Sequence, residues 1–266
     1  MNRREFAVLG GAAVLSAQSA AHAQSDALKQ LLAEVANDPS IVEDGWQFQE
    51  PTVSRGVGHG TPSKRKLSGI ASDLIIAFEV ASPAVYEKKY RRPIWPKGAS
   101  GVTIGVGYDL RFANKSYIER DWPMLSASDR ALLASVATLS GEKAREATQN
   151  VQAVVVPWKD ARTQFFAFLP YPTKQTEDAF PNCGKLHDDS FGALVSLVYN
   201  RGPKINRNSK TRREMYEIQQ SMQAMEFDRV PAQIRSMKRL WQTPESRGLV
   251  RRREAEALLF EQGLRA

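Results

Sequence analysis

Residues 67–83, LSGIASDLIIAFEVASP, carry apolar side chains at the spacing of a helix and decide the first part of the fold. Ser68 or Ser72 can cap the start of this helix, and Pro83 stops it. Glu79 closes its apolar face. Partial burial there would favour the neutral, proton-donating form of the carboxyl. The helix therefore presents one candidate general acid at its C-terminal end.

The next informative stretch is VTIGVGYD at residues 102–109. β-branched residues alternate with glycines here, which predicts a strand or a hairpin. Thr103 has a stiff χ1 on a strand, so its hydroxyl is held in one direction at little entropic cost. Gly105 and Gly107 remove side-chain bulk, which lets a polymer lie close to the backbone. Asp109 follows directly and adds a second carboxyl.

From residue 121 onward the pattern is helical almost throughout. A helix, a small sheet and then a helical bundle predict an α+β fold. Helices are predicted over residues 126–139, 141–150, 158–169, 188–200, 211–225, 229–241 and 247–261.

Residues 25–35 form a short amphipathic pattern that ends at 37–39. Residues 46–66 are rich in Gly, Pro, Ser and Thr and predict a linker or a surface loop. We therefore expect an N-terminal helix and linker over 24–66, followed by a main domain over 67–266 that carries the candidate residues.

The first 23 residues have the three-part layout of a secretory signal peptide, with predicted cleavage after Ala23. The apolar part, from Phe6 to Ala17, is shorter than the roughly 20 residues that span a bilayer. Arg3 and Arg4 fit either an ordinary basic region or a twin-arginine export signal. We expect no later segment to span a membrane, and hence a periplasmic or secreted protein without stable membrane insertion.

The chain of 266 residues has a formal net charge of +8, which suits nucleic acid, anionic lipid or bacterial wall polymers. An exported protein meets the wall before DNA, so we expect no nucleic-acid partner. Cys183 is the one cysteine, which excludes an internal disulfide and predicts a buried thiol. His59 and His187 have no partners at metal-ligand spacing, so neither a metal nor another cofactor is expected.

Three motifs resemble the lysozymes of tailed phages. Phe78-Glu79 is followed by Tyr86 and then by the hairpin TIGVG at 103–107. The run ALVSLVYNRG at 193–202 is similar to their central buried helix, and GLVRRREAE at 248–256 is similar to their closing motif. The resemblance covers residues 68–262. It implies a lysozyme-like fold and a muramidase that acts on peptidoglycan glycan strands.

The sequence departs from the phage pattern at two positions. Lys88 stands where the phage enzymes have a catalytic Asp, and Tyr108 stands where they have a His. Asp109, six residues after Thr103, is instead similar to the pesticin-type muramidase domain. That resemblance implies Glu79 as the acid, Asp109 as the base and Thr103 as the group that positions water.

Three more residues are candidate substrate contacts: Tyr108, Trp95 and Asn200. Structural packing explains Trp95 equally well. Arg252, beside Glu254 and Glu256, is expected to form ion pairs that hold the last helix. We expect the protein to be a monomer. Two other functions stay open: a non-catalytic peptidoglycan-binding protein, and an inhibitor or immunity protein on the same fold.

Overall fold

The computed structural model describes residues 25–48, 56–58 and 60–266, and residues 1–24, 49–55 and 59 lie outside this part. The predicted signal peptide with its cleavage site after Ala23 falls outside the described residues, as do His59 and the middle of the predicted linker. Those expectations stay predictions.

The N-terminal segment packs on the rest of the molecule. Residues 25–37 are helical, as the pattern predicts, and are followed by α2 (Ser40–Glu43) and the 3₁₀ turn η1 (Asp44–Phe48). Leu28 and Val35 have no exposed surface and belong to the main hydrophobic core. The boundary predicted at residue 67 therefore does not separate two cores.

Helix α3 (Gly69–Val80) matches the predicted apolar helix. The Ser68 hydroxyl caps it by accepting a hydrogen bond from the backbone N–H of Ala71. Ala81 ends the helix with a left-handed backbone, at φ 62°. Pro83 then opens α4 (Pro83–Lys89), because its fixed φ suits the first helical position. Helix α4 was not predicted from the sequence, where Pro83 was expected only to end the preceding helix.

One helical run is long and apolar enough to cross a membrane, by length and composition alone. The helical run Gly69–Lys89 has 21 residues with a mean hydropathy of 1.3, which is apolar enough to cross a bilayer. The run is broken at Ala81, and 61% of its most apolar window is buried within the fold. Leu74 and Ile75, for example, have no exposed surface. Packing in the core accounts for this hydropathy.

A two-stranded antiparallel hairpin follows, formed by β1 (Thr103–Ile104) and β2 (Tyr108–Asp109). Thr103 pairs with Asp109, and Ile104 pairs with Tyr108. Residues directly opposite each other in such a pair place their side chains on the same face. The register therefore puts the Thr103 and Asp109 side chains on one face.

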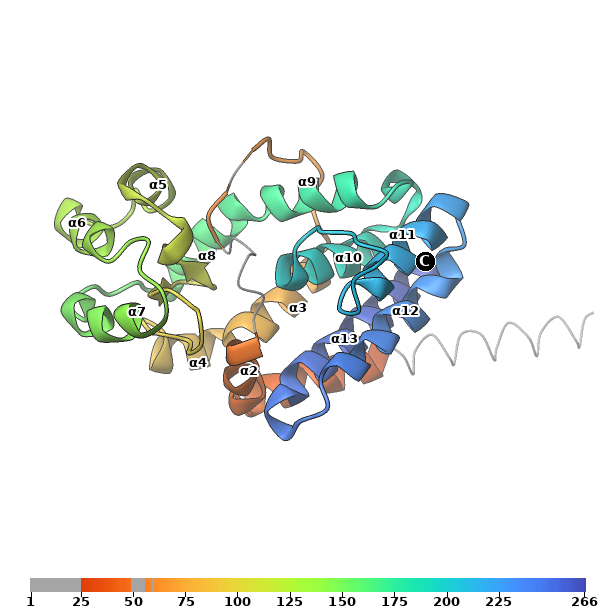
Figure 1. Ribbon diagram of the computed structural model, residues 1–266, viewed down its shortest axis with the longest axis horizontal. Helices are drawn as coiled ribbons and strands as arrows, with labels where there is room; N and C mark the ends of the chain where they lie inside the picture. The colour runs from red at the N-terminus through yellow and green to blue at the C-terminus, as the bar shows by residue number, and fades with distance from the viewer. Residues whose placement is uncertain (1–24, 49–55, 59) are drawn as a thin grey trace, which may run out of the picture.

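A group of short helices follows the hairpin and lies apart from the main bundle in Figure 1. Helix α8 (Trp158–Phe168) then leads towards the bundle. The group contains η2 (Leu110–Phe112), α5 (Lys115–Asp121), α6 (Ala127–Ser135), α7 (Gly141–Ala147) and η3 (Thr148–Val151).

The bundle is arranged around α10 (Asp188–Arg201), in which every residue after Asp188 is buried. Helix α10 packs against α3, α9 and α13. The remaining elements are α9 (Pro170–Ala179), η4 (Cys183–Lys185), α11 (Arg213–Ala224), η5 (Phe227–Arg229), α12 (Val230–Ser236), η6 (Met237–Leu240), η7 (Pro244–Ser246) and α13 (Arg247–Leu264). Helices with one small antiparallel sheet give the α+β composition that the sequence predicts.

Candidate active site

Glu79 lies one residue before the C-terminal end of α3, facing the hairpin turn, and is 4% exposed. Gly107 in the turn has φ +77°, a left-handed backbone that L side chains rarely adopt. A Cβ atom placed on Gly107 would come within 3.1 Å of Glu79 Oε2. Glycine at this position therefore lets the backbone of the turn approach the carboxyl.

A cleft of about 420 Å³ opens between the end of α3 and the hairpin. It contains all three residues predicted for catalysis. Its lining comprises Trp46, Glu79, Val80, Tyr90, Ile94, Pro96, Thr103, Ile104, Gly105, Gly107 and Asp109.

A second hollow of about 300 Å³ adjoins the first, since Trp46 and Glu79 line both. It lies over α13 and α2, where Ile41, Asn200, Leu249 and Arg252 are among its lining residues. Glu79 therefore stands at the junction of two hollows.

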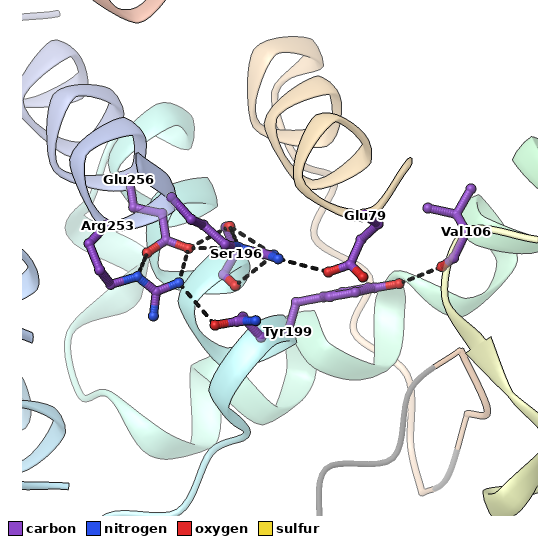
Figure 2. A network of polar contacts seen from close by, with 8 residues as sticks. Glu79, Val106, Ser196, Tyr199, Arg253 and Glu256 are labelled. Atoms are coloured by element: carbon purple, nitrogen blue, oxygen red, sulfur yellow. Dashed lines mark hydrogen bonds and ion pairs between the residues drawn. The ribbon is translucent and has the colours of Figure 1, made fainter. Parts of the chain in front are cut away.

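A buried ion pair fixes the Glu79 carboxyl. Arg252 Nη1 on α13 donates to Glu79 Oε1 at 2.7 Å, and the two side chains are 2% and 3% exposed. Arg252 also contacts Ser196 and Glu256, and Ser196 Oγ donates to Glu256 Oε1 at 2.7 Å. Figure 2 shows this network, in which Glu256 and Ser196 are linked to Glu79 through Arg252. The guanidinium of a residue on the last helix thereby holds the buried carboxyl in one orientation.

A further hydrogen bond reaches the hairpin. Tyr199 on α10 donates its hydroxyl hydrogen to the carbonyl oxygen of Val106 at 3.0 Å, next to Glu79 in Figure 2. Val106 lies between Gly105 and Gly107, at the tip of the turn. Tyr199 therefore ties the turn to the central helix on the side of the carboxyl.

Asp109 is 2% exposed and accepts several hydrogen bonds. Its Oδ1 accepts from the backbone N–H groups of Gly101 at 3.1 Å and Arg111 at 2.9 Å, and its Oδ2 pairs with the Arg111 guanidinium at 3.2 Å. The carboxyl thus caps η2 as well as lining the cleft.

Thr103 Oγ1 donates to the carbonyl oxygen of Gly101 at 3.2 Å. The Thr103 backbone also bridges to Ile94, so β1 is held on both sides. Contacts with the backbone of Gly101 therefore position both the Thr103 hydroxyl and the Asp109 carboxyl.

The expectation for Tyr108 is corrected by its burial. Its ring has no exposed surface and packs edge-on against Trp122, with centroids 5.4 Å apart. Its hydroxyl donates to Asp121 Oδ2 at 2.9 Å, and burial, with help from Asp121, raises the pKa of Tyr108. A side chain without exposed surface cannot contact a glycan, so Tyr108 is a core residue of the hairpin.

The other two predicted substrate contacts differ in position. Trp95 is half-buried between the lining residues Ile94 and Pro96, and its indole N–H donates to the carbonyl oxygen of Ser100 at 3.2 Å. Trp95 itself does not line either hollow. Asn200 lines the second hollow, with its Oδ1 accepting from Arg253 Nη2 at 3.2 Å.

Two aromatic residues of the cleft were not predicted from the sequence. Trp46, on η1, packs edge-on against Tyr90 with ring centroids 5.5 Å apart. The Tyr90 hydroxyl donates to Glu43 at 2.6 Å, and burial together with this bond raises the pKa of Tyr90. Tyr90 follows the predicted helix closely and could have been considered, whereas Trp46 lies in the stretch read as a linker.

Within residues 25–48, 56–58 and 60–266, no group of three or more His, Cys, Asp and Glu side chains is placed to hold a metal ion. Cys183 is a free, buried cysteine as predicted, and burial raises the pKa of its thiol to about 12. This thiol is far from nucleophilic at neutral pH.

Residues 76–169 match a family described as a domain of unknown function, DUF8812. The matched region contains Glu79, Thr103 and Asp109 but ends before α10 and α13. No curated protein matches the chain. The chain is therefore similar, over about a third of its length, to a family whose description names no activity.

Proposed function

We propose that this protein is a peptidoglycan hydrolase, a muramidase that cleaves the β-1,4 bond between N-acetylmuramic acid and N-acetylglucosamine on a lysozyme-like fold. One observation carries the proposal: Glu79 at a helix end and Asp109 on a hairpin line the same cleft. Glycoside hydrolysis commonly uses two carboxyls that flank the bond to be cut. The motif resemblance and the predicted export signal support a wall substrate.

In the proposed reaction, Glu79 donates a proton to the glycosidic oxygen as the bond to the sugar carbon breaks. Asp109 takes a proton from the attacking water, and Thr103 orients that water. Water is consumed, and the two halves of the strand leave with new hydroxyl groups. Arg252 holds Oε1 of Glu79, so we assign proton donation to Oε2, the oxygen nearest Gly107.

Trp46 and Tyr90 supply an aromatic wall beside these groups. An aromatic face binds the apolar face of a sugar ring and leaves the sugar hydroxyls available for hydrogen bonds. These two aromatic side chains can therefore bind a saccharide that carries no charge.

The experiment is to replace Glu79 by Gln and to follow digestion of dye-labelled sacculi. The amide can still accept from Arg252 but cannot donate the proton, so activity should fall at least about 100-fold. Glu87→Gln is the matched control, because Glu87 is 41% exposed on α4 and does not line the cleft. Loss of activity in both variants, or more than about a tenth of wild-type activity in Glu79→Gln, would contradict the proposal.

A non-catalytic wall-binding protein is the second candidate. It is favoured by the contacts that occupy both carboxyls, Arg252 on Glu79 and Arg111 on Asp109. Co-sedimentation with sacculi separates the two candidates. A binding protein keeps its full function in Glu79→Gln, whereas an enzyme keeps affinity and loses turnover.

A further inference from the structure

A separate hollow of about 550 Å³ lies at the loop that precedes α11, and it shares no residue with the candidate cleft. None of its lining residues is acidic or apolar. They are Arg207, Asn208, Ser209, Lys210, Arg213 and Arg239, and we refer to this set as the basic pocket. Four cations and two polar side chains therefore surround one space.

The loop has a defined shape. Asn206 Oδ1 accepts from the backbone N–H of Asn208 at 3.0 Å. Arg239 Nη2, reaching from η6, donates to the carbonyl oxygen of Lys210 at 2.6 Å, and its Nε pairs with the fully buried Glu214 at 2.5 Å. The basic pocket is thus built from two chain segments that are fastened together.

The charge of the pocket is only partly balanced. Arg239 pairs with Glu214, and Arg213 pairs with Glu217 at 3.3 Å. In the described part of the chain, no acidic side chain lies within ion-pair distance of Arg207 or Lys210, and Arg207 has only the distant ring of Tyr216, 5.9 Å away. Two uncompensated cations beside two partly compensated ones repel each other, and an anion in the hollow would relieve that repulsion.

We propose that the basic pocket binds phosphate groups. Guanidinium groups hold phosphate oxygens by paired N–H donors, and a lysine adds a compact positive charge. The amide of Asn208 and the hydroxyl of Ser209 supply further donors at the same space. Donors from several directions suit a tetrahedral oxyanion better than a planar carboxylate. This site is independent of the proposed glycan hydrolysis.

The phosphate group bound in this pocket can belong to a soluble molecule, to a wall polymer or to a phospholipid headgroup. Calorimetric titration with inorganic pyrophosphate tests the phosphate site itself. Vesicles of phosphatidylglycerol, compared with vesicles of phosphatidylcholine, test the lipid source. Binding to phosphatidylglycerol vesicles that depends on the basic pocket identifies a headgroup ligand, and pyrophosphate binding without vesicle binding identifies a polymer or free phosphate.

The decisive variant is Arg207→Gln with Lys210→Gln. Both side chains are exposed, so the fold should be kept, as circular dichroism would check. The control is Lys64→Gln with Lys66→Gln, which removes the same charge from two exposed lysines on another surface.

We expect the wild type and the control to bind pyrophosphate alike and the pocket variant to bind at least about tenfold more weakly. Equal weakening in both variants would show attraction by net charge alone and would overturn the proposal. Absence of pyrophosphate binding to the wild type would overturn it as well.

Discussion

Replacing Arg252 by Met tests whether the last helix holds the candidate acid. The substitution keeps an apolar stem of similar length and removes the guanidinium that donates to Glu79. Because Glu79 is 4% exposed, its carboxyl would lose this guanidinium contact in the protein interior. Loss of one partner of a buried ion pair typically costs about 3–5 kcal/mol.

The contacts of Arg252 place the expected loss at the lower end of that range. Glu256, its second acidic partner, keeps Arg253, whose Nε lies 2.8 Å from Oε2. Only Glu79 therefore loses its cation, and we expect the free energy of unfolding to fall by about 3 kcal/mol. For a domain of this size, that corresponds to a fall in Tm of about 6–12 °C.

Urea denaturation of three variants measures this loss. Arg251→Met is the control, because Arg251 pairs at the surface with Glu34 and should change stability by less than about 1 kcal/mol. The double variant Arg252→Met with Glu79→Gln should be more stable than Arg252→Met alone, since a neutral amide loses less than a carboxylate when the guanidinium is absent. A single variant within about 1 kcal/mol of wild type, or a double variant that recovers nothing, would refute the reasoning.

Three other outcomes follow from the described contacts. Trp46→Ala should raise KM for the wall substrate about tenfold and leave kcat nearly unchanged, because Trp46 lines the cleft. Trp95→Ala should change KM little, because Trp95 does not line the cleft. Equal effects of the two variants in steady-state assays would contradict this prediction. Tyr199→Phe should cost about 1 kcal/mol in thermal unfolding and lower activity, because the Val106 carbonyl loses its donor; unchanged stability and activity would show that the bond is dispensable. Burial raises the pKa of Cys183 from 9.0 to about 12, so its protonated thiol stabilises the fold below pH 9, and this contribution is lost as the pH rises towards 12. The unfolding free energy of Cys183→Ala should therefore fall less than that of wild type over this range, and parallel curves would disagree.

Much of the candidate site could be predicted from local patterns. The helical period of α3 and the glycine-rich hairpin are local signals, and they placed Glu79, Thr103 and Asp109 on elements that meet at one cleft. Tyr108 was misplaced because successive strand residues alternate between faces. Asp109 faces the cleft, so its neighbour Tyr108 points to the opposite face, into the core beside Trp122.

The role of the N-terminal segment could not be predicted, because it depends on contacts between distant residues. A Cβ atom on Gly248 would lie 1.8 Å from the Ile41 carbonyl oxygen, so glycine alone allows α2 to approach α13 this closely. That approach carries Trp46 to the cleft. The stretch from residue 46 has no periodicity of its own, so nothing local indicated its place.

The ion pairs of the last helix were predicted only in kind. The cluster Arg252, Glu254 and Glu256 was expected to hold α13, and Glu254 does pair with Arg235 and Lys238. Arg252 pairs with Glu256 on the same helix, as expected, and also reaches Glu79, which is 173 positions away along the chain. Spacing along one helix cannot indicate a partner on another helix.

The most direct test of the proposed function is mass spectrometry of the fragments released from purified sacculi. A muramidase with Glu79 as its acid should release disaccharide-peptides that carry N-acetylmuramic acid at the reducing end, and Glu79→Gln should release none above background. Release of the same fragments by Glu79→Gln, or of no glycan fragments by the wild type, would contradict the account.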